Sequence, residues 1–342
     1  MKAFYAAEQK RHDPKAFLSS GAPQPNPEQP ERAERLLSGA RAAGLEIVRP
    51  RDHGLGPIAA VHTPEYLDFL EHIYTRWQRI PGASPEVIPN IHPIARNGSY
   101  PASAVGQAGY HMADTACPIS AETFESVCWS AWSAVDAADA VAAGAPAAYA
   151  LCRPPGHHAF ADVAGGFCFV NNSAVAAQHL LKTAARVAIL DVDLHHGNGT
   201  QGIFYARPDV LTVSIHADPV RFYPFFWGHA DERGEGPGLG YNLNLPLARK
   251  SGDAEFMTTL DPAFRRIRAF APDALVVALG LDAFEGDPFG GLSVTTPGFA
   301  RMAEAIAGLG IPSVIVQEGG YLCDALGDNL TAFLTGFGTK TG

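Results

Sequence analysis

Short apolar runs alternate with longer amphipathic segments along most of the chain. The apolar runs predict buried strands at 3–7, 147–151, 187–190, 210–215, 241–245, 274–279 and 313–316. Apolar side chains three and four positions apart predict helices at 32–43, 64–77, 120–143, 174–182, 254–270, 297–309 and 324–337. This alternation predicts an α/β protein of three layers, α/β/α, in which a mainly parallel sheet is covered on both faces by helices.

One long segment, from about Gln78 to Ser120, departs from the alternation because proline and glycine recur through it. A structureless stretch of this length inside a compact domain is usually functional or part of an interface. In a floppy surface loop its apolar side chains would be left exposed; they are Ile88, Ile91, Ile94, Tyr100 and Tyr110. We therefore expect an excursion over 78–120 that covers a neighbouring site or another subunit, with Ser120 as the N-cap of the next helix.

Composition narrows the class of protein. The 342 residues are 47% hydrophobic and 18% charged, which predicts one compact globular domain over 1–342. The 35 acidic and 25 basic residues give a net charge of −10, which argues against nucleic-acid binding. Five cysteines without a CxxC pair argue against a disulfide framework. Since we find neither the apolar core of a signal peptide nor a membrane-length apolar run, we expect a cytoplasmic protein without membrane contact.

The densest polar chemistry lies in the sequence Asp191-Val192-Asp193-Leu194-His195, directly after an apolar run. Because side chains alternate along an extended chain, Asp191, Asp193 and His195 are expected to point the same way. Burying two like charges is costly unless a cation neutralises them, so this stretch predicts a metal site. The alternative is a polar strand end with a hydrogen-bonded histidine, and it is less favoured because uncompensated buried acids are rare.

Three further predicted strands end in residues that carry chemistry. Ligand sites in open α/β sheets lie beyond the carboxyl ends of the strands, where this chain has His157, His158, Asp282 and Tyr321. Asp282 is the best third metal ligand. Two carboxylates and one imidazole leave open positions for water and substrate, as in catalytic zinc sites, and iron or cobalt accept similar ligands. Magnesium or calcium would more typically use oxygen ligands alone.

The two histidines and the tyrosine predict acid–base chemistry beside that metal. A Pro-Pro-Gly sequence stiffens the backbone before His157 and His158, which as imidazoles can serve as general base and acid near neutral pH. Tyr321 follows two glycines, and its phenol can donate a hydrogen bond to a developing oxyanion. Taken alone, Tyr321 would be read as an ordinary core or surface tyrosine.

Four ordered motifs resemble the histone deacetylase superfamily, most closely its acetylpolyamine amidohydrolase branch. They span 153–158, 165–172, 191–200 and 318–321, with weaker matches at 61–67 and 30–32. The resemblance implies an arginase/deacetylase fold with a parallel sheet of about eight strands. It also implies zinc-dependent amide hydrolysis, with zinc bound by Asp193, His195 and Asp282. By the same resemblance Tyr321 polarises the acetyl carbonyl, His158 activates the water and protonates the leaving amine, and His157 stabilises the transition state.

The resemblance extends to residues around the centre. Asp191 resembles the family's aspartate that pairs with the first catalytic histidine, here His157. Together with the Ser214 hydroxyl and backbone carbonyls, Asp191 also resembles the family's potassium site. A second monovalent-cation site is implied near Phe204, Arg207, Val210 and Tyr241. The residues that correspond to substrate contacts are Gly166, Phe167, Tyr223, Phe289 near the mouth, Gly319, and Arg32 deeper inside.

Two positions differ from related patterns. Many histone deacetylases have an aspartate beside the second catalytic histidine, where this chain has Asn198 and resembles the polyamine branch. An asparagine cannot stabilise an imidazolium by charge, so His158 should have a lower pKa than with an aspartate there. The polyamine branch meets its cationic amine with acidic loop residues, whereas the aligned positions here are Val105 and Ala116. Asp114, close by, is expected to take that role.

The expected reaction is hydrolytic deacetylation of an acetylated primary amine, with release of acetate. Small cationic acetylpolyamines such as acetylputrescine, acetylcadaverine and acetylspermidine are the leading substrates, and a homodimer is expected to narrow the entrance. Acetyl-lysine peptides or small amides are the alternative substrates. An arginase-like ureohydrolase with two manganese ions would need another acid where this chain has Gly280. A non-catalytic acyl-amine binding module could lose Tyr321 or a histidine, yet all are retained.

Overall fold

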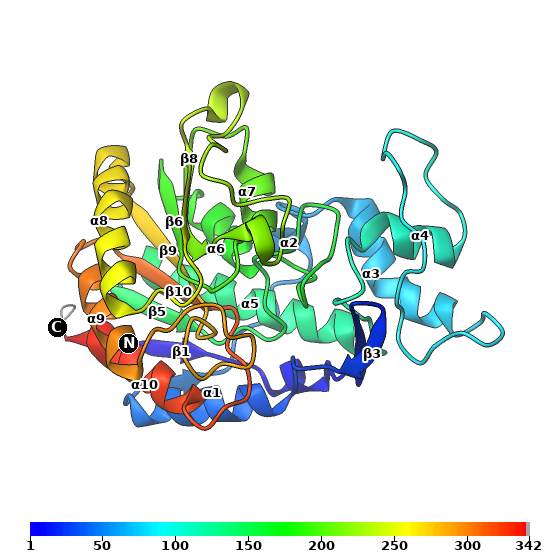
Figure 1. The fold of residues 1–342 in the computed structure, drawn as a ribbon, viewed down its shortest axis with the longest axis horizontal. Coiled ribbons are helices and arrows are strands. Elements are labelled where there is room, and N and C mark those ends of the chain that lie inside the picture. Colours follow the sequence, from blue (N-terminus) through cyan, green and yellow to red (C-terminus); the bar gives the residue numbers. More distant parts are fainter. Residues whose placement is uncertain (340–342) are drawn as a thin grey trace.

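The computed structural model describes residues 1–339 and contains a central eight-stranded sheet with helices on both faces (Figure 1). All strand pairs of this sheet are parallel, in the order β4-β1-β5-β10-β9-β6-β7-β8. The strands are β1 (Lys2–Phe4), β4 (Glu46–Val48), β5 (Ala147–Ala150), β6 (Val187–Asp191), β7 (Val210–Ala217), β8 (Asn242–Leu247), β9 (Ala274–Leu279) and β10 (Ser313–Gln317). The predicted three-layer architecture is confirmed.

Alternate residues of the central strands feed two separate cores. Leu190 of β6 packs with the helices of one face, and Ile189 packs with those of the other. The first face is covered by α1 (Glu31–Ala42), α8 (Asp253–Phe270), α9 (Thr296–Ala307) and α10 (Leu326–Gly338). The second is covered by α5 (Thr123–Ala142), α6 (Asn172–Leu180) and α7 (Asn198–Phe204). Because both faces are covered, the strands β5, β6, β7, β9 and β10 are buried at every position, which explains their continuous apolar sequences.

The strand order brings four chemistry-bearing strand ends together. β5, β10, β9 and β6 are consecutive neighbours at the centre of the sheet. They lead into the segments that carry the histidine pair, Tyr321, Asp282 and the Asp193–His195 stretch, in that order. These side chains therefore meet at one edge of the sheet although up to 164 positions separate His157 from Tyr321 (321 − 157).

The 78–120 excursion is partly ordered, so the prediction of a structureless stretch is wrong. It contains α4 (Ala104–His111), which begins where the Ser103 hydroxyl accepts a hydrogen bond from the N–H of Gly106 at 3.0 Å. A bridge between Val87 and Ile119 ties its two ends together. α4 packs with α3 (Pro64–Trp77) at the end of the molecule away from the N-terminus (Figure 1), while Ile91 and Ile94 remain exposed.

Several local predictions also need correction. The helix expected from Ser120 begins at Thr123, because the Ser120 hydroxyl binds the Thr123 hydroxyl at 3.1 Å instead of capping the helix. The first strand ends at Phe4 and gives way to a 3₁₀ helix over Ala7–Arg11. The proline-rich stretch expected to be a loop contains an antiparallel hairpin of β2 (Ala16–Ser19) and β3 (Ala22–Pro25). Its prolines suit this isolated, exposed pair of strands. A short helix, α2 (Gly56–Ala59), was not expected either.

No helix within residues 1–339 combines the length and the apolarity that a membrane crossing requires.

Candidate active site

Asp193, His195 and Asp282 form a compact buried cluster at the carboxyl edge of the sheet. The Nδ1 atom of His195 lies 3.1 Å from Asp282 Oδ2 and 3.4 Å from Asp193 Oδ1. One ligand atom from each residue lies within 4.8 Å of the others, and all three side chains are buried. Asp193 and His195 follow β6, whereas Asp282 follows β9, which pairs with β6. The cluster therefore assembles from two neighbouring strand ends.

The electrostatics of this cluster favour a bound cation. Burial and the charge of Asp193 raise the pKa of Asp282. Burial alone would lower the pKa of His195, but its hydrogen bonds with Asp193 and Asp282 raise it to about 9. The two buried carboxylates are therefore stabilised by nearby positive charge. Within residues 1–339, no Lys or Arg side chain forms an ion pair with either of them. Two carboxylates and one imidazole, with the remaining positions open to solvent or substrate, fit a catalytic zinc ion.

Glycines let the backbone approach this cluster closely. A Cβ atom at Gly280 or Gly319 would overlap the Asp193 carboxylate. The N–H of Gly319 instead donates to Asp193 Oδ2 at 2.8 Å, which orients the carboxylate. Gly280 occupies the position where an arginase-like two-metal site would need another acid. The close approach of Asp193 leaves no room there for a side chain.

Asp191 does not join the metal cluster, although it lies two positions before Asp193. Its Oδ2 atom binds His157 Nδ1 at 2.9 Å, and its Oδ1 atom accepts from the N–H of Asp193 at 3.0 Å. Burial alone would lower the pKa of His157, but the charges of Asp193 and Asp191 raise it to about 10. The carboxylates of Asp193 and Asp191 therefore favour the charged form of His157.

His158 lies beside His157, with 4.0 Å between the ring centroids, yet its environment is different. Its Nδ1 atom lies 2.7 Å from Asn198 Oδ1 at the start of α7. Since an amide oxygen only accepts, Nδ1 carries the proton and Nε2 keeps a free lone pair. Burial and the charges of His157 and His195 hold the pKa of His158 well below its usual range. The site thus pairs one charged and one neutral histidine.

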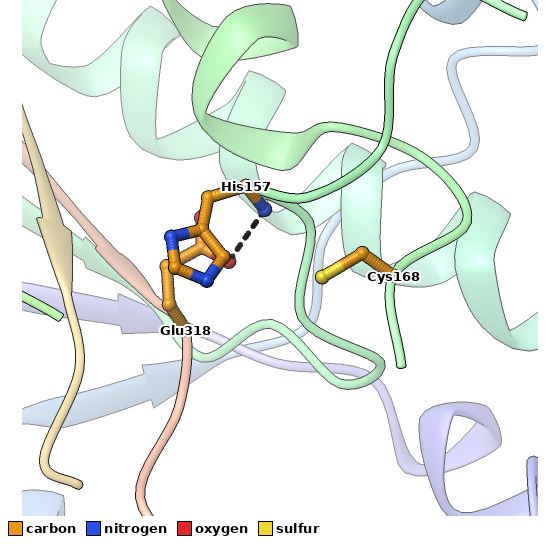
Figure 2. A group of neighbouring side chains, drawn as sticks. All are labelled: His157, Cys168 and Glu318. Carbon is orange, nitrogen blue, oxygen red and sulfur yellow. Dashed lines mark hydrogen bonds between the residues drawn. The ribbon is translucent and has the colours of Figure 1, made fainter. Parts of the chain in front are cut away.

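Glu318 fixes the backbone of the segment that carries His157 and His158. Its Oε2 atom accepts from the N–H of His157 at 3.0 Å (Figure 2) and from the N–H of Gly156 at 2.6 Å. Its Oε1 atom accepts from the Ser173 hydroxyl at 2.7 Å. Burial raises the pKa of Glu318 to about 7. Cys168 completes a group with metal-ligand spacing, but burial raises the pKa of its thiol, and the Glu318 oxygens already have donors. This group therefore stabilises the loop that contains Gly156 and His157, and its contacts do not require a metal ion.

A second group with metal-ligand spacing, formed by His53, Asp136 and Asp139, is also explained without an ion. The Arg51 guanidinium forms ion pairs with Asp136 at 2.5 Å and with Asp139 at 2.6 Å. Its charge neutralises these carboxylates, so the group is an ion-pair network on α5.

Tyr321 is held from three sides. Its N–H donates to Asp287 Oδ2 at 2.9 Å, and its ring packs against Phe289 with 4.6 Å between the centroids. The Arg32 guanidinium lies 4.9 Å from the ring centroid. Burial raises the pKa of Tyr321 well above its usual range, so the phenol stays protonated and can donate a hydrogen bond.

Arg32 is buried behind Tyr321 rather than in the pocket wall. Its guanidinium donates to the carbonyls of Gly320 and Glu318 at 2.5 and 2.8 Å and pairs with Glu28 at 2.6 Å. Arg32 thus stabilises the turn that presents the phenol.

A pocket of about 420 Å³ leads to these groups. It is lined by Phe17, Leu18, Ser19, Ser20, Asp114, Thr115, Ala116, His158, Gly166, Phe167, His195, Arg221, Phe222, Tyr223, Phe225, Phe289 and Tyr321. The pocket wall therefore includes His195 of the buried Asp193–His195–Asp282 cluster, the neutral His158 and the Tyr321 phenol, together with several aromatic side chains.

The sequence matches the Histone deacetylase domain over residues 26–337. The chain belongs to the histone deacetylase family. It is 49% identical, over the whole of both chains, to the acetylpolyamine amidohydrolase of Burkholderia pseudomallei (strain 1710b), and 42% identical, over 98% of this chain and 99% of the relative, to that of Mycoplana ramosa. A crystal structure of the acetylpolyamine aminohydrolase from Burkholderia pseudomallei superimposes with a TM-score of 0.96 at 49% identity, covering 99% of both chains.

Within this histone deacetylase family pocket, five of the residues predicted to contact substrate line the wall: Asp114, Gly166, Phe167, Tyr223 and Phe289. Gly319 lies beneath the metal cluster instead, and Val105 lies on α4 outside the lining. Asp114 accepts hydrogen bonds from Tyr223 Oη at 2.7 Å and from the N–H groups of Ala116 and Gly166 at 2.8 and 3.1 Å. It therefore joins two walls of the pocket.

Sequence reasoning missed two segments of this lining. The β2–β3 hairpin contributes Phe17 to Ser20, and the segment after β7 contributes Arg221, Phe222 and Phe225. Phe222 stacks on His195, with 5.1 Å between ring centroids and an interplanar angle of 17°. A dense aromatic run at 222–227 was the available signal for the second segment.

The two expected cation sites show different surroundings. Ser214 pairs with Asp191 in the β6–β7 register, and its hydroxyl lies 2.7 Å from His216 Nδ1. At the second, Arg207 forms an ion pair with Asp209 at 2.6 Å and lies 5.1 Å over the Phe204 ring, while the Tyr241 carbonyl accepts from the N–H of Thr212 at 3.0 Å. Val210 begins β7 and is buried.

Proposed function

We propose that this protein is a zinc-dependent amidohydrolase that deacetylates acetylated primary amines and releases acetate. The observation that carries the proposal is a single pocket whose wall includes His158, Tyr321 and His195, the last of which belongs to the buried cluster with Asp193 and Asp282. His158 is neutral and the Tyr321 phenol is protonated. The names of the relatives from Burkholderia pseudomallei and Mycoplana ramosa support acetylpolyamines as substrates, among them acetylputrescine, acetylcadaverine and acetylspermidine.

Asp193, His195 and Asp282 would hold the zinc ion. When bound, zinc polarises the acetyl carbonyl and lowers the pKa of a water molecule. His158 accepts the proton of the attacking water at Nε2, because its Nδ1–H is engaged with Asn198. The same Nε2–H then protonates the departing amine, which must leave as a neutral or cationic amine rather than an amide anion.

His157 and Tyr321 stabilise the negative charge that develops on the acetyl oxygen. His157 is held in its charged form by Asp191 and contributes a fixed positive charge beside His158. The Tyr321 phenol donates to the oxyanion, and its contacts with Phe289 and Arg32 orient it before substrate arrives. Preorganised donors of this kind are worth about 3 to 4 kcal/mol each in other hydrolases.

The aromatic walls suit a chain of methylene groups that ends in an ammonium group. Phe167, Phe222 and Phe289 offer apolar area along the pocket, and Asp114 offers a half-buried carboxylate. Three donors already bind Asp114, and an ionised carboxylate can accept about four. One ammonium group can therefore be bound there.

The remaining proposals concern ions and assembly. We propose a potassium ion beside Asp191 and Ser214, and a second monovalent ion near Phe204, Arg207, Val210 and Tyr241. The exposed Ile91 and Ile94 support a homodimer formed through the 78–120 excursion. Free cysteines throughout the chain support a reducing compartment such as the cytoplasm.

The test compares acetylputrescine, acetylspermidine and an acetyl-lysine peptide with zinc-loaded protein, following acetate release. We expect turnover of the two polyamine derivatives and no turnover by the Asp282→Ala variant. Preference for the peptide would replace the polyamine assignment while retaining the chemistry. Binding without acetate release would point to a non-catalytic module. Two manganese ions per chain with release of urea from a guanidino substrate would favour the arginase-like alternative.

A further inference from the structure

The pocket that should receive a cationic amine carries little net negative charge. Besides His158 and His195, its charged lining residues are one acid, Asp114, and one base, Arg221. The other lining side chains are aromatic, aliphatic or hydroxyl-bearing. A chain with net charge −10 thus presents an almost neutral route to its candidate centre.

Arg221 contributes an uncompensated positive charge to this route. Its side chain is exposed, and within residues 1–339 no carboxylate forms an ion pair with it. The nearest acid in the sequence, Asp218, accepts from the N–H of Val220 at 2.9 Å and caps the 3₁₀ helix over Pro219–Arg221. A second guanidinium, that of Arg249, lies 5.3 Å from the centroid of the Phe222 ring. No ion pair within residues 1–339 therefore offsets the charge of Arg221.

Asp114 has a limited capacity to offset that charge. Its carboxylate already accepts from Ala116, Gly166 and Tyr223, so one ammonium group completes its hydrogen bonding. Tyr223 lies two positions after Arg221 along the chain, so the acid and the base belong to the same part of the wall. An amine with one ammonium can be neutralised at Asp114, whereas a further ammonium shares the pocket with Arg221 and has no second acid in the lining to bind it.

We propose that Arg221 is a specificity-determining residue that favours acetylated amines with a single remaining ammonium group over those with two or more. This inference rests on the proposed function. Repulsion between two exposed like charges that lie about 8 Å apart, at an effective dielectric constant of about 60, weakens binding about threefold. The expected discrimination between substrates with one and two ammonium groups is therefore modest. Because the charges involved are exposed to solvent, salt should weaken it.

The experiment measures kcat/KM for three substrates with zinc-loaded protein at low salt. They are N-acetylbutylamine, N-acetylputrescine and N-acetylspermidine, which retain no, one and two positive charges. For Arg221→Gln we expect the acetylspermidine to acetylputrescine ratio to rise about threefold, and for Arg221→Glu about tenfold. The rate with N-acetylbutylamine should change little, and 0.5 M salt should remove most of both increases.

Two control variants separate local charge from other effects. Arg221→Lys keeps the charge and should keep the acetylspermidine to acetylputrescine ratio. Arg268→Gln removes an equal charge from an exposed position on α8 and should also leave this ratio unchanged. An unchanged ratio in Arg221→Gln and Arg221→Glu, or a fall in it, overturns the inference. Failure of the wild-type protein to release acetate from all three substrates overturns the proposed function instead, so the two failures can be distinguished.

Discussion

The carboxylate of Asp287 accepts a hydrogen bond from the backbone N–H of Tyr321 at 2.9 Å. Its other oxygen accepts from the N–H of Phe289, also at 2.9 Å. One buried acid therefore fixes both the phenol and the aromatic wall against which that phenol packs. Burial and the charge of Asp282 raise the pKa of Asp287 to about 7, and backbone N–H groups are its hydrogen-bond donors.

We expect Asp287→Asn to lower kcat about tenfold. An asparagine can accept only through its oxygen, so one of the two backbone hydrogen bonds is lost, at a cost of about 1 kcal/mol, and the phenol loses its alignment. The measurement is steady-state kinetics with an acetylated amine, in both the wild-type and the Tyr321→Phe background. If Asp287 acts through Tyr321, its substitution should matter much less when the phenol is absent.

A matched control is available in Asp273, whose carboxylate accepts from the N–H groups of Ala185 and Arg186 at 2.8 and 3.0 Å, before β9 begins. Asp273→Asn should leave kcat near the wild-type value. Equal losses of activity from Asp287→Asn in both backgrounds would contradict the positioning role.

Tyr321→Phe should retain the fold and the metal but lose at least about a hundredfold in kcat. The substitution removes one donor to the oxyanion and leaves the packing of the ring against Phe289 in place. Zinc content, thermal unfolding and kcat are measured together. Near-normal turnover would exclude the oxyanion role of the phenol.

Asn198→Asp should move the acidic limb of the kcat/KM profile to higher pH. A carboxylate beside Nδ1 favours the imidazolium, so it raises the pKa of His158, and the neutral base is then populated only at higher pH. The profile is recorded between pH 5 and 9 for both proteins. A limb that stays in place would mean that another group controls it.

His62 offers a test of stability against pH. Burial lowers the pKa of His62 to about 4, and its ring accepts from the N–H of Asn171 at 2.9 Å, so the folded protein keeps it neutral. The unfolded chain binds a proton near pH 6.5, so the stability from His62 falls by about 1 kcal/mol between pH 7.5 and 5.5. His62→Gln should remove that dependence in urea unfolding.

The comparison of the two proteins isolates His62 because other buried groups are common to both. Glu318 and Asp287 have pKa values raised to about 7, so folding favours their protonated forms and their contribution to stability rises as the pH falls. Identical pH dependence in the wild-type and His62→Gln proteins would contradict the assignment.

The sequence was sufficient for the parts of the molecule that rest on side-chain pattern. The central strands are buried on both faces, so they read as apolar runs, and Asp282 was found because it follows one of them. The β2–β3 hairpin was missed because it lies outside the main sheet and contains two prolines in β3.

The supporting acids could not be predicted for a different reason. Asp287 binds two backbone N–H groups, and Glu318 binds two in addition to the Ser173 hydroxyl. Every residue except proline possesses a backbone N–H, so these partners leave no mark in the sequence. The order of strands, which makes β9 and β10 neighbours of β6 and β5, likewise depends on packing of the whole sheet.

That strand order has a consequence for biosynthesis. Asp193 and His195 leave the ribosome well before Asp282 and Tyr321, yet β9 and β10 are the strands that fill the space between β5 and β6. A nascent chain that ends before β9 would carry the proposed metal ligands Asp193 and His195, and the pair His157 and His158, at strand ends that are not yet neighbours. Metal affinity and hydrolysis should therefore appear together and late, only after the C-terminal strands have inserted at the centre of the sheet.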